Sequence, residues 1–159
     1  MQEVTINKQA KLSEHFTLRE LCKTSVKTAD GNIPSHVHIE NLKRLCGWQE
    51  MLRDEWNRRY GEGDDPIIIN SGYRSDAVNK AIDGVKSSNH LKGCAADIRV
   101  AGMEQALRYA VILLDISDES REDFDELLIE RSPKGGYWLH FAVRPPSQEN
   151  RRKVRFIQT

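Results

Sequence analysis

The sequence has few cysteines, no excess of either charge and no long apolar run, and each shortage excludes a class of protein. Three cysteines among 159 residues make an odd and sparse set, which argues against a disulfide framework. Lysine plus arginine and aspartate plus glutamate both number 24, so the basic surface typical of a nucleic-acid-binding protein is missing. No apolar run approaches the roughly 20 residues that span a bilayer. We therefore expect neither a nucleic-acid partner nor membrane insertion.

The first residues, Met1–Lys8, lack the charged start and the apolar core of a secretory signal. We therefore expect synthesis in the cytoplasm without a signal peptide, so that work outside the membrane would need another route of release. The hydrophobic fraction of 38% and the charged fraction of 30% are typical of a globular protein with a real core. We expect one monomeric domain over residues 1–159, with residues 1–13 and about 145–159 at its periphery.

Hydrophobic periodicity predicts both helices and strands. One expected helix begins after Thr17, and three further helices are expected at about 35–60, 76–82 and 103–114. The expected strands are 67–69, 94–100, 127–129 and 137–141. The last two strands are separated by a turn that contains Pro and Gly, which predicts a hairpin. The acidic stretch 115–123 is interpreted as an exposed connection, and the basic end of the chain as a solvated flank.

One stretch, Ser87–Ile98, carries two possible metal ligands, His90 and Asp97, with small residues between them. Asp97 falls in an apolar strand, where a carboxylate is costly to bury unless it is paired or bound to a metal. Imidazole and carboxylate are ordinary zinc ligands, and catalytic zinc takes three protein ligands plus a water. Cys94 is a weak candidate because a lone thiol at this spacing fits no structural zinc pattern, so all three cysteines are interpreted as buried packing residues.

His140 is the best candidate for the third ligand, because it lies within the aromatic and apolar run 138–141. The alternative for His140 taken alone is a hydrogen-bonded core histidine. The remaining histidines are interpreted as surface residues near the starts of helices: His15, His36 and His38.

A zinc hydrolase also needs a carboxylate that accepts a proton from the metal-bound water. If Glu130 pairs with Trp138 across the hairpin, the two-residue period of a strand puts Glu130 and His140 on one face. A slip of one residue would turn Glu130 to the other face. Asp125 and Glu126 are the alternative bases, and both could equally lie at a solvated strand edge.

Arg74 follows a strand on a turn that contains glycine. A fixed cation beside a zinc site could neutralise a substrate carboxylate or the oxyanion of a tetrahedral intermediate. A structural salt bridge to one of the many carboxylates explains the residue equally well. The sequence fits both a cation beside the zinc site and a structural salt bridge at Arg74.

Taken together, these residues resemble the zinc D-Ala-D-Ala carboxypeptidase family. The motifs are Ser-Gly-Tyr-Arg-Ser at 71–75, Ser88-x-His90-x-x-Gly93-x-Ala95-Ala96-Asp97, Phe124-Asp125-Glu126-Leu127 and Trp138-x-His140. The wider group includes L-alanyl-D-glutamate endolysins, D-Ala-D-Ala dipeptidases and the hedgehog signalling domain. The resemblance covers nearly the whole chain, from Phe16 to Arg152. It implies an α+β fold in which helices flank a small antiparallel sheet that carries the metal site.

The resemblance also implies zinc (Zn²⁺) bound by His90, Asp97 and His140 and hydrolysis of peptide bonds in the peptidoglycan stem. Either a carboxypeptidase or an endolysin-like endopeptidase fits. The single domain without a signal peptide or a wall-binding repeat favours a phage or mobile-element lysin acting on the cell wall, or a wall-remodelling enzyme exported by another route. The implied roles are Glu130 as base, Arg74 as a catalytic and substrate-binding cation, and further substrate contacts from Tyr73, Ser88 and Trp138.

Several branches of the family place the catalytic acid three residues before the last histidine, where this chain has Tyr137. One alternative is therefore a non-catalytic zinc-binding module for cell-wall or protein recognition. Another is a metal-free domain whose histidines are coincidental. An intact Glu130 near the metal favours the enzyme.

Overall fold

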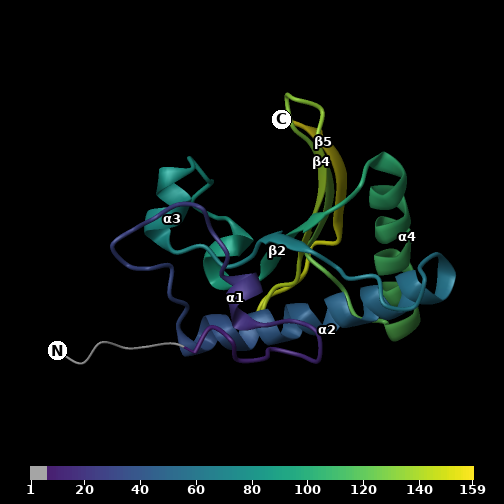
Figure 1. Ribbon diagram of the computed structural model, residues 1–159, viewed down its shortest axis with the longest axis horizontal. Helices are drawn as coiled ribbons and strands as arrows, with labels where there is room; N and C mark the ends of the chain where they lie inside the picture. Colours follow the sequence, from purple (N-terminus) through teal and green to yellow (C-terminus); the bar gives the residue numbers. More distant parts are fainter. Residues whose placement is uncertain (1–6) are drawn as a thin grey trace.

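A computed structural model describes residues 7–159 of the chain, and Figure 1 shows the arrangement of its elements. Its helices are α1 (Leu18–Leu21), α2 (His36–Arg59), α3 (Asp76–Ala81), α4 (Met103–Ser120) and the short 3-10 helix η1 (Asn89–Lys92). Its strands are β1 (Ile69–Ser71), β2 (Ala95–Arg99), β3 (Glu126–Arg131), β4 (Tyr137–Ala142) and β5 (Lys153–Gln158). The expected α+β class is confirmed.

The strands form one sheet in the order β1-β2-β4-β3-β5. The first four are antiparallel to their neighbours, as expected, whereas β5 pairs parallel to β3 and makes the sheet mixed. The end of the chain, expected to be peripheral, thus contains an edge strand that the sequence analysis does not predict. Most side chains of β5 are exposed, so this edge strand is held by backbone pairing and shows little apolar pattern in the sequence.

Two long helices, α2 and α4, pack against each other and against the sheet. Helix α2 runs along the base of the molecule, and α3 lies at the end of the molecule away from α4 (Figure 1). Alternate side chains of the strands supply the core on the helix side, among them Ile98, Leu139 and Phe141, each 0% exposed. Because side chains alternate along a strand, the neighbours Asp97 and His140 are directed to the other face. That face carries the candidate site.

Local signals explain where several helices begin. Thr17 caps α1 in a reciprocal capping box with Glu20, and the Ser75 hydroxyl accepts a hydrogen bond from the backbone N–H of Val78 at the start of α3. No helix within residues 7–159 combines the length and the apolar character needed to cross a membrane.

Two boundaries differ from the sequence expectation. Helix α4 continues six residues beyond 114, to Ser120, because Ile116 and Ser117 are buried on its inner face; most of the acidic stretch is thus helical. The first strand lies at 69–71 rather than 67–69, since its pairing with β2 begins only at Ile69. Of the expected peripheral segment 1–13, residues 1–6 lie outside the described range.

Candidate metal centre

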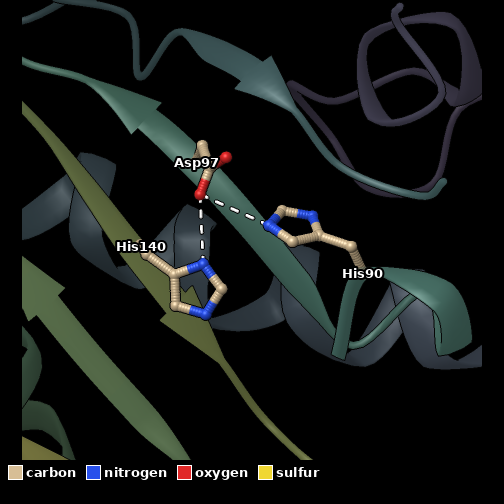
Figure 2. A group of neighbouring side chains, drawn as sticks. All are labelled: His90, Asp97 and His140. Carbon is tan, nitrogen blue, oxygen red and sulfur yellow. Dashed lines mark hydrogen bonds and ion pairs between the residues drawn. The ribbon is translucent and has the colours of Figure 1, made fainter. Parts of the chain in front are cut away.

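Three ligand atoms from His90, Asp97 and His140 lie within 4.8 Å of one another. Figure 2 shows that both imidazoles approach the same carboxylate oxygen of Asp97. Nε2 of His90 is 3.4 Å and Nδ1 of His140 is 3.1 Å from that Oδ1. Zinc at about 2.0–2.1 Å from each of its tetrahedral ligands would separate them by about 3.3 Å. The two distances to Oδ1 of Asp97 fit that geometry.

The backbone brings these side chains together from three elements. Asp97 of β2 and His140 of β4 are direct partners in the antiparallel ladder. His90 comes from η1, whose start is capped by the Ser88 hydroxyl and whose end is Gly93 in the left-handed conformation, with φ of 71°. Because Gly93 also approaches the backbone of α2 closely, a side chain there would push η1 away from the helix.

The second nitrogen of His90 fixes which atom faces Asp97. Nδ1 of His90 lies 2.6 Å from the backbone oxygen of Gly72. A carbonyl only accepts hydrogen bonds, so Nδ1 carries a hydrogen, and Nε2 is the ring atom that faces Asp97. With its hydrogen held on Nδ1, the imidazole can offer the lone pair of Nε2 to a metal bound between the ring and Asp97.

His140 lies between two carboxylates. Its Nδ1 faces Asp97 and its Nε2 lies 3.1 Å from Oε1 of Glu126. Burial alone would lower the pKa of His140, but its hydrogen bonds to Asp97 and Glu126 outweigh burial and raise the pKa to about 9. A metal at Nδ1 would take the place of that proton, and Nε2–H would still donate to Glu126.

Arg74 contacts the metal-binding carboxylate itself. Its Nη2 donates to Oδ2 of Asp97 at 3.1 Å and its Nε donates to the Ser71 hydroxyl at 3.2 Å. Burial alone would raise the pKa of Asp97, but the two histidines keep it well below the usual range. Arg74 also lines the cleft, so its salt bridge to Asp97 leaves it at the cleft.

The predicted hairpin register is confirmed: Glu130 pairs with Trp138, and Leu128 pairs with His140. Glu130 therefore shares the face of His140, and the indole Nε1 of Trp138 donates to its Oε2 at 2.6 Å. Burial raises the pKa of Glu130 above its usual value. A carboxylate with a raised pKa beside a candidate metal site has the properties of a general base.

The alternative bases, Asp125 and Glu126, do not lie at a solvated edge, and that interpretation is corrected. Asp125 is 0% exposed and is paired with Arg144 and Arg151. The hydrogen bond from His140 outweighs burial and lowers the pKa of Glu126 to about 2. Both carboxylates are committed to partners in the protein, because each is held by buried or half-buried hydrogen bonds.

A cleft of about 750 Å³ opens beside the metal ligands. It is lined by Arg74, Ser88, Glu130 and Trp138 together with His90, Asp97 and His140. Tyr73 is not among its lining residues: the ring is 5% exposed within the core and stacks on His38 at 4.8 Å between ring centroids. The expected substrate contact from Tyr73 is therefore corrected, because the side chain turns inward.

The other histidines and the cysteines lie apart from the centre. His15 and His36 are exposed, and His15 pairs with Glu50 at 2.7 Å. The three cysteines are buried and free, as expected. Burial raises the pKa of Cys94 to about 11, which favours the thiol form, and Cys94 is not part of the His90–Asp97–His140 cluster.

Two imidazoles and one carboxylate, open to a cleft, form the donor set of a mononuclear catalytic zinc site. The chain belongs to the peptidase M15 family, whose model matches residues 14–121. It is similar to the zinc D-Ala-D-Ala carboxypeptidase of Streptomyces albus G, with 31% identity over 85 residues, which are 53% of this chain and 31% of that protein. The matched part is thus less than a third of the length of that relative. The family match includes His90 and Asp97 and ends before His140.

Proposed function

We propose that this chain is a zinc-dependent peptidase that hydrolyses peptide bonds in peptidoglycan stem peptides. It acts as a D-Ala-D-Ala carboxypeptidase or as an endolysin-like endopeptidase, and its place of action is the cell wall. The observation that carries the proposal is the position of Glu130, a half-buried carboxylate on the same sheet face as the His90–Asp97–His140 cluster. The similarity to a D-Ala-D-Ala carboxypeptidase supports the choice of substrate.

Zinc bound by His90, Asp97 and His140 would supply a Lewis acid and lower the pKa of a bound water toward about 7. Glu130 accepts a proton from the attacking water and returns it to the leaving amine. The raised pKa of Glu130 suits both steps, because a general acid–base works best when its pKa approaches the working pH. Trp138 holds the carboxylate through its indole N–H.

Arg74 supplies positive charge at the edge of the same cleft. Its guanidinium is fixed by Ser71 and Asp97, so little reorganisation is needed when negative charge develops on the scissile carbonyl oxygen. The cleft volume of about 750 Å³ lies within the ordinary range of ligand sites, about 300–1,000 Å³, and accommodates a short peptide.

The test compares wild type with Glu130→Gln on purified sacculi and on synthetic stem peptides that end in D-Ala-D-Ala. Mass spectrometry of the products identifies the scissile bond. We expect cleavage by wild type and a loss of about 10²–10⁴-fold in rate in Glu130→Gln, with zinc content unchanged. Glu62→Gln, in an exposed turn, is the matched control and should cleave like wild type. Stoichiometric zinc without cleavage of any of these substrates would instead establish a non-catalytic zinc-binding module.

A further inference from the structure

A chain of polar side chains connects His140, on the side of its ring away from Asp97, with the segment that carries His90. Glu126 accepts from Nε2–H of His140 at 3.1 Å. Asn89, the residue before His90, donates to the same Oε1 of Glu126 at 2.7 Å. Both donors point at one oxygen, so the position of Glu126 depends on His140 and on the segment that carries His90.

The other hydrogen of the Asn89 amide continues the chain into the protein. It donates to Oδ2 of Asp125 at 2.8 Å. Asp125 is 0% exposed, and a buried carboxylate is stable only when it is paired. Arg151 supplies a two-point pairing, with Nε to Oδ1 at 3.0 Å and Nη2 to Oδ2 at 2.8 Å, and Arg144 adds a contact at 3.1 Å.

We propose that Glu126 is a positioning residue for the metal centre and that Arg151, two residues before β5, holds it in place, both directly, with Nη2 3.8 Å from Oε2 of Glu126, and through Asp125 and Asn89. The proposal rests on the metal assignment made under the proposed function. Glu126 sets the rotation of the His140 ring and keeps its hydrogen on Nε2, which leaves Nδ1 free to bind metal. Such outer partners of metal-binding histidines contribute about 10–100-fold to metal affinity.

The geometry separates Glu126 from Glu130. Both flank Leu128, the residue paired with His140, and both share the cleft face. Glu126 binds the imidazole of His140, whereas Glu130 binds only the indole of Trp138 among the contacts described. The basic end of the chain, which lies beyond the family match at 14–121, thereby takes part in the metal site.

The test measures zinc affinity by competition with a chromophoric chelator, and the Co²⁺ absorption spectrum as a report on ligand geometry. We expect Glu126→Ala to weaken zinc binding by about 10–100-fold and to change the Co²⁺ spectrum. Glu126→Gln keeps an acceptor oxygen and should restore part of the affinity. Arg151→Ala should weaken binding in the same direction by a smaller factor.

Arg152→Ala is the matched control, because Arg152 is the neighbouring residue and also forms ion pairs. Its partners are Asp118 at 2.7 Å and Asp123 at 3.2 Å, and neither touches Asn89, Glu126 or His140 among the contacts described. Its zinc affinity and Co²⁺ spectrum should match wild type. Circular dichroism of the metal-free proteins checks that each variant is folded. If Glu126→Ala does not fold, the two single variants Glu126→Gln and Arg151→Ala test the positioning role.

The positioning role would be overturned if Glu126→Gln and Arg151→Ala both keep the zinc affinity and the Co²⁺ spectrum of wild type. Glu126→Ala, where it folds, would have to behave in the same way. Equal weakening in Arg151→Ala and Arg152→Ala would also overturn it, because the effect would then be general destabilisation. If wild type itself binds no zinc, the metal assignment fails and the proposed function fails with it. The readout therefore separates the two failures.

Discussion

The two ends of strand β3 on the cleft side carry the same side chain in opposite environments. Glu126 accepts hydrogen bonds from His140 and Asn89, and its pKa is lowered to about 2. Glu130 receives a hydrogen bond from Trp138, and burial raises its pKa. Paired carboxylates whose pKa values are driven apart are a common feature of hydrolase sites. Here the comparison separates a carboxylate that stays ionised from one that can exchange protons.

The largest effect on zinc binding and cleavage is expected from Asp97→Asn, which removes the carboxylate that both His90 and His140 approach. The carboxylate oxygen that both imidazoles approach would then belong to a neutral amide, and we expect zinc to be lost on dialysis. Cleavage should fall on the order of a thousandfold or more, since a metal supplies several kcal/mol of transition-state stabilisation. Elemental analysis and peptide cleavage check the result, and retention of stoichiometric zinc would contradict it.

The sequence predicts those features of the site that depend on residues close together in the chain. His90 and Asp97 lie in one stretch, and the apolar run around His140 predicts a strand. The pairing of that strand beside Asp97, 43 positions away, is implied by the family resemblance and not by a local pattern. The register of Glu130 with Trp138 follows from the short turn between two apolar runs. In each case the period of a single element decides which face a side chain takes.

The remaining features depend on contacts between distant segments, which no local pattern predicts. Arg151 reaches Asp125 across 26 positions, and the sequence offers 24 acidic residues as possible partners. Strand β5 is exposed on most positions and lacks the alternation that marks a half-buried strand. The inward turn of Tyr73 likewise depends on packing in the core and could not be read from its place beside Arg74.

A smaller effect, on stability, is expected at the Glu126 end of β3, where Asp125 accepts a hydrogen bond from the Asn89 amide that also binds Glu126. Burial alone would raise the pKa of Asp125, but hydrogen bonds from Arg151 and Asn89 lower it to about 2. Since the unfolded value is about 3.9, the carboxylate adds roughly 2–3 kcal/mol to the free energy of unfolding. That contribution is complete above the unfolded pKa and is lost as the pH falls toward the folded one.

Urea unfolding of the metal-free protein between neutral pH and the acid range measures this contribution. Asp125→Asn should be less stable than wild type near neutral pH and should lose less stability on acidification. Asp123→Asn serves as control, because Asp123 is exposed and pairs with Arg152 instead. Parallel acid profiles for wild type and Asp125→Asn would show that Asp125 is not held ionised by its partners.

The smallest effect is expected at the Glu130 end, from Trp138→Phe. The indole hydrogen bond favours the ionised form of Glu130 and partly offsets burial. A base must be deprotonated to act, so kcat/KM should fall as the pH drops through the pKa of Glu130, above the usual glutamate value of about 4.3. Phenylalanine keeps the aromatic packing and removes the donor, which should move this acid limb to higher pH by about one unit, since a hydrogen bond to a charged group contributes about 1.5–3 kcal/mol.

Zinc affinity should not change, because Trp138 contacts neither Glu126 nor the outer nitrogen of His140 among the contacts described. A shift of the acid limb without a change in zinc affinity would assign the titrating base to Glu130; an unmoved limb would mean that another group titrates there.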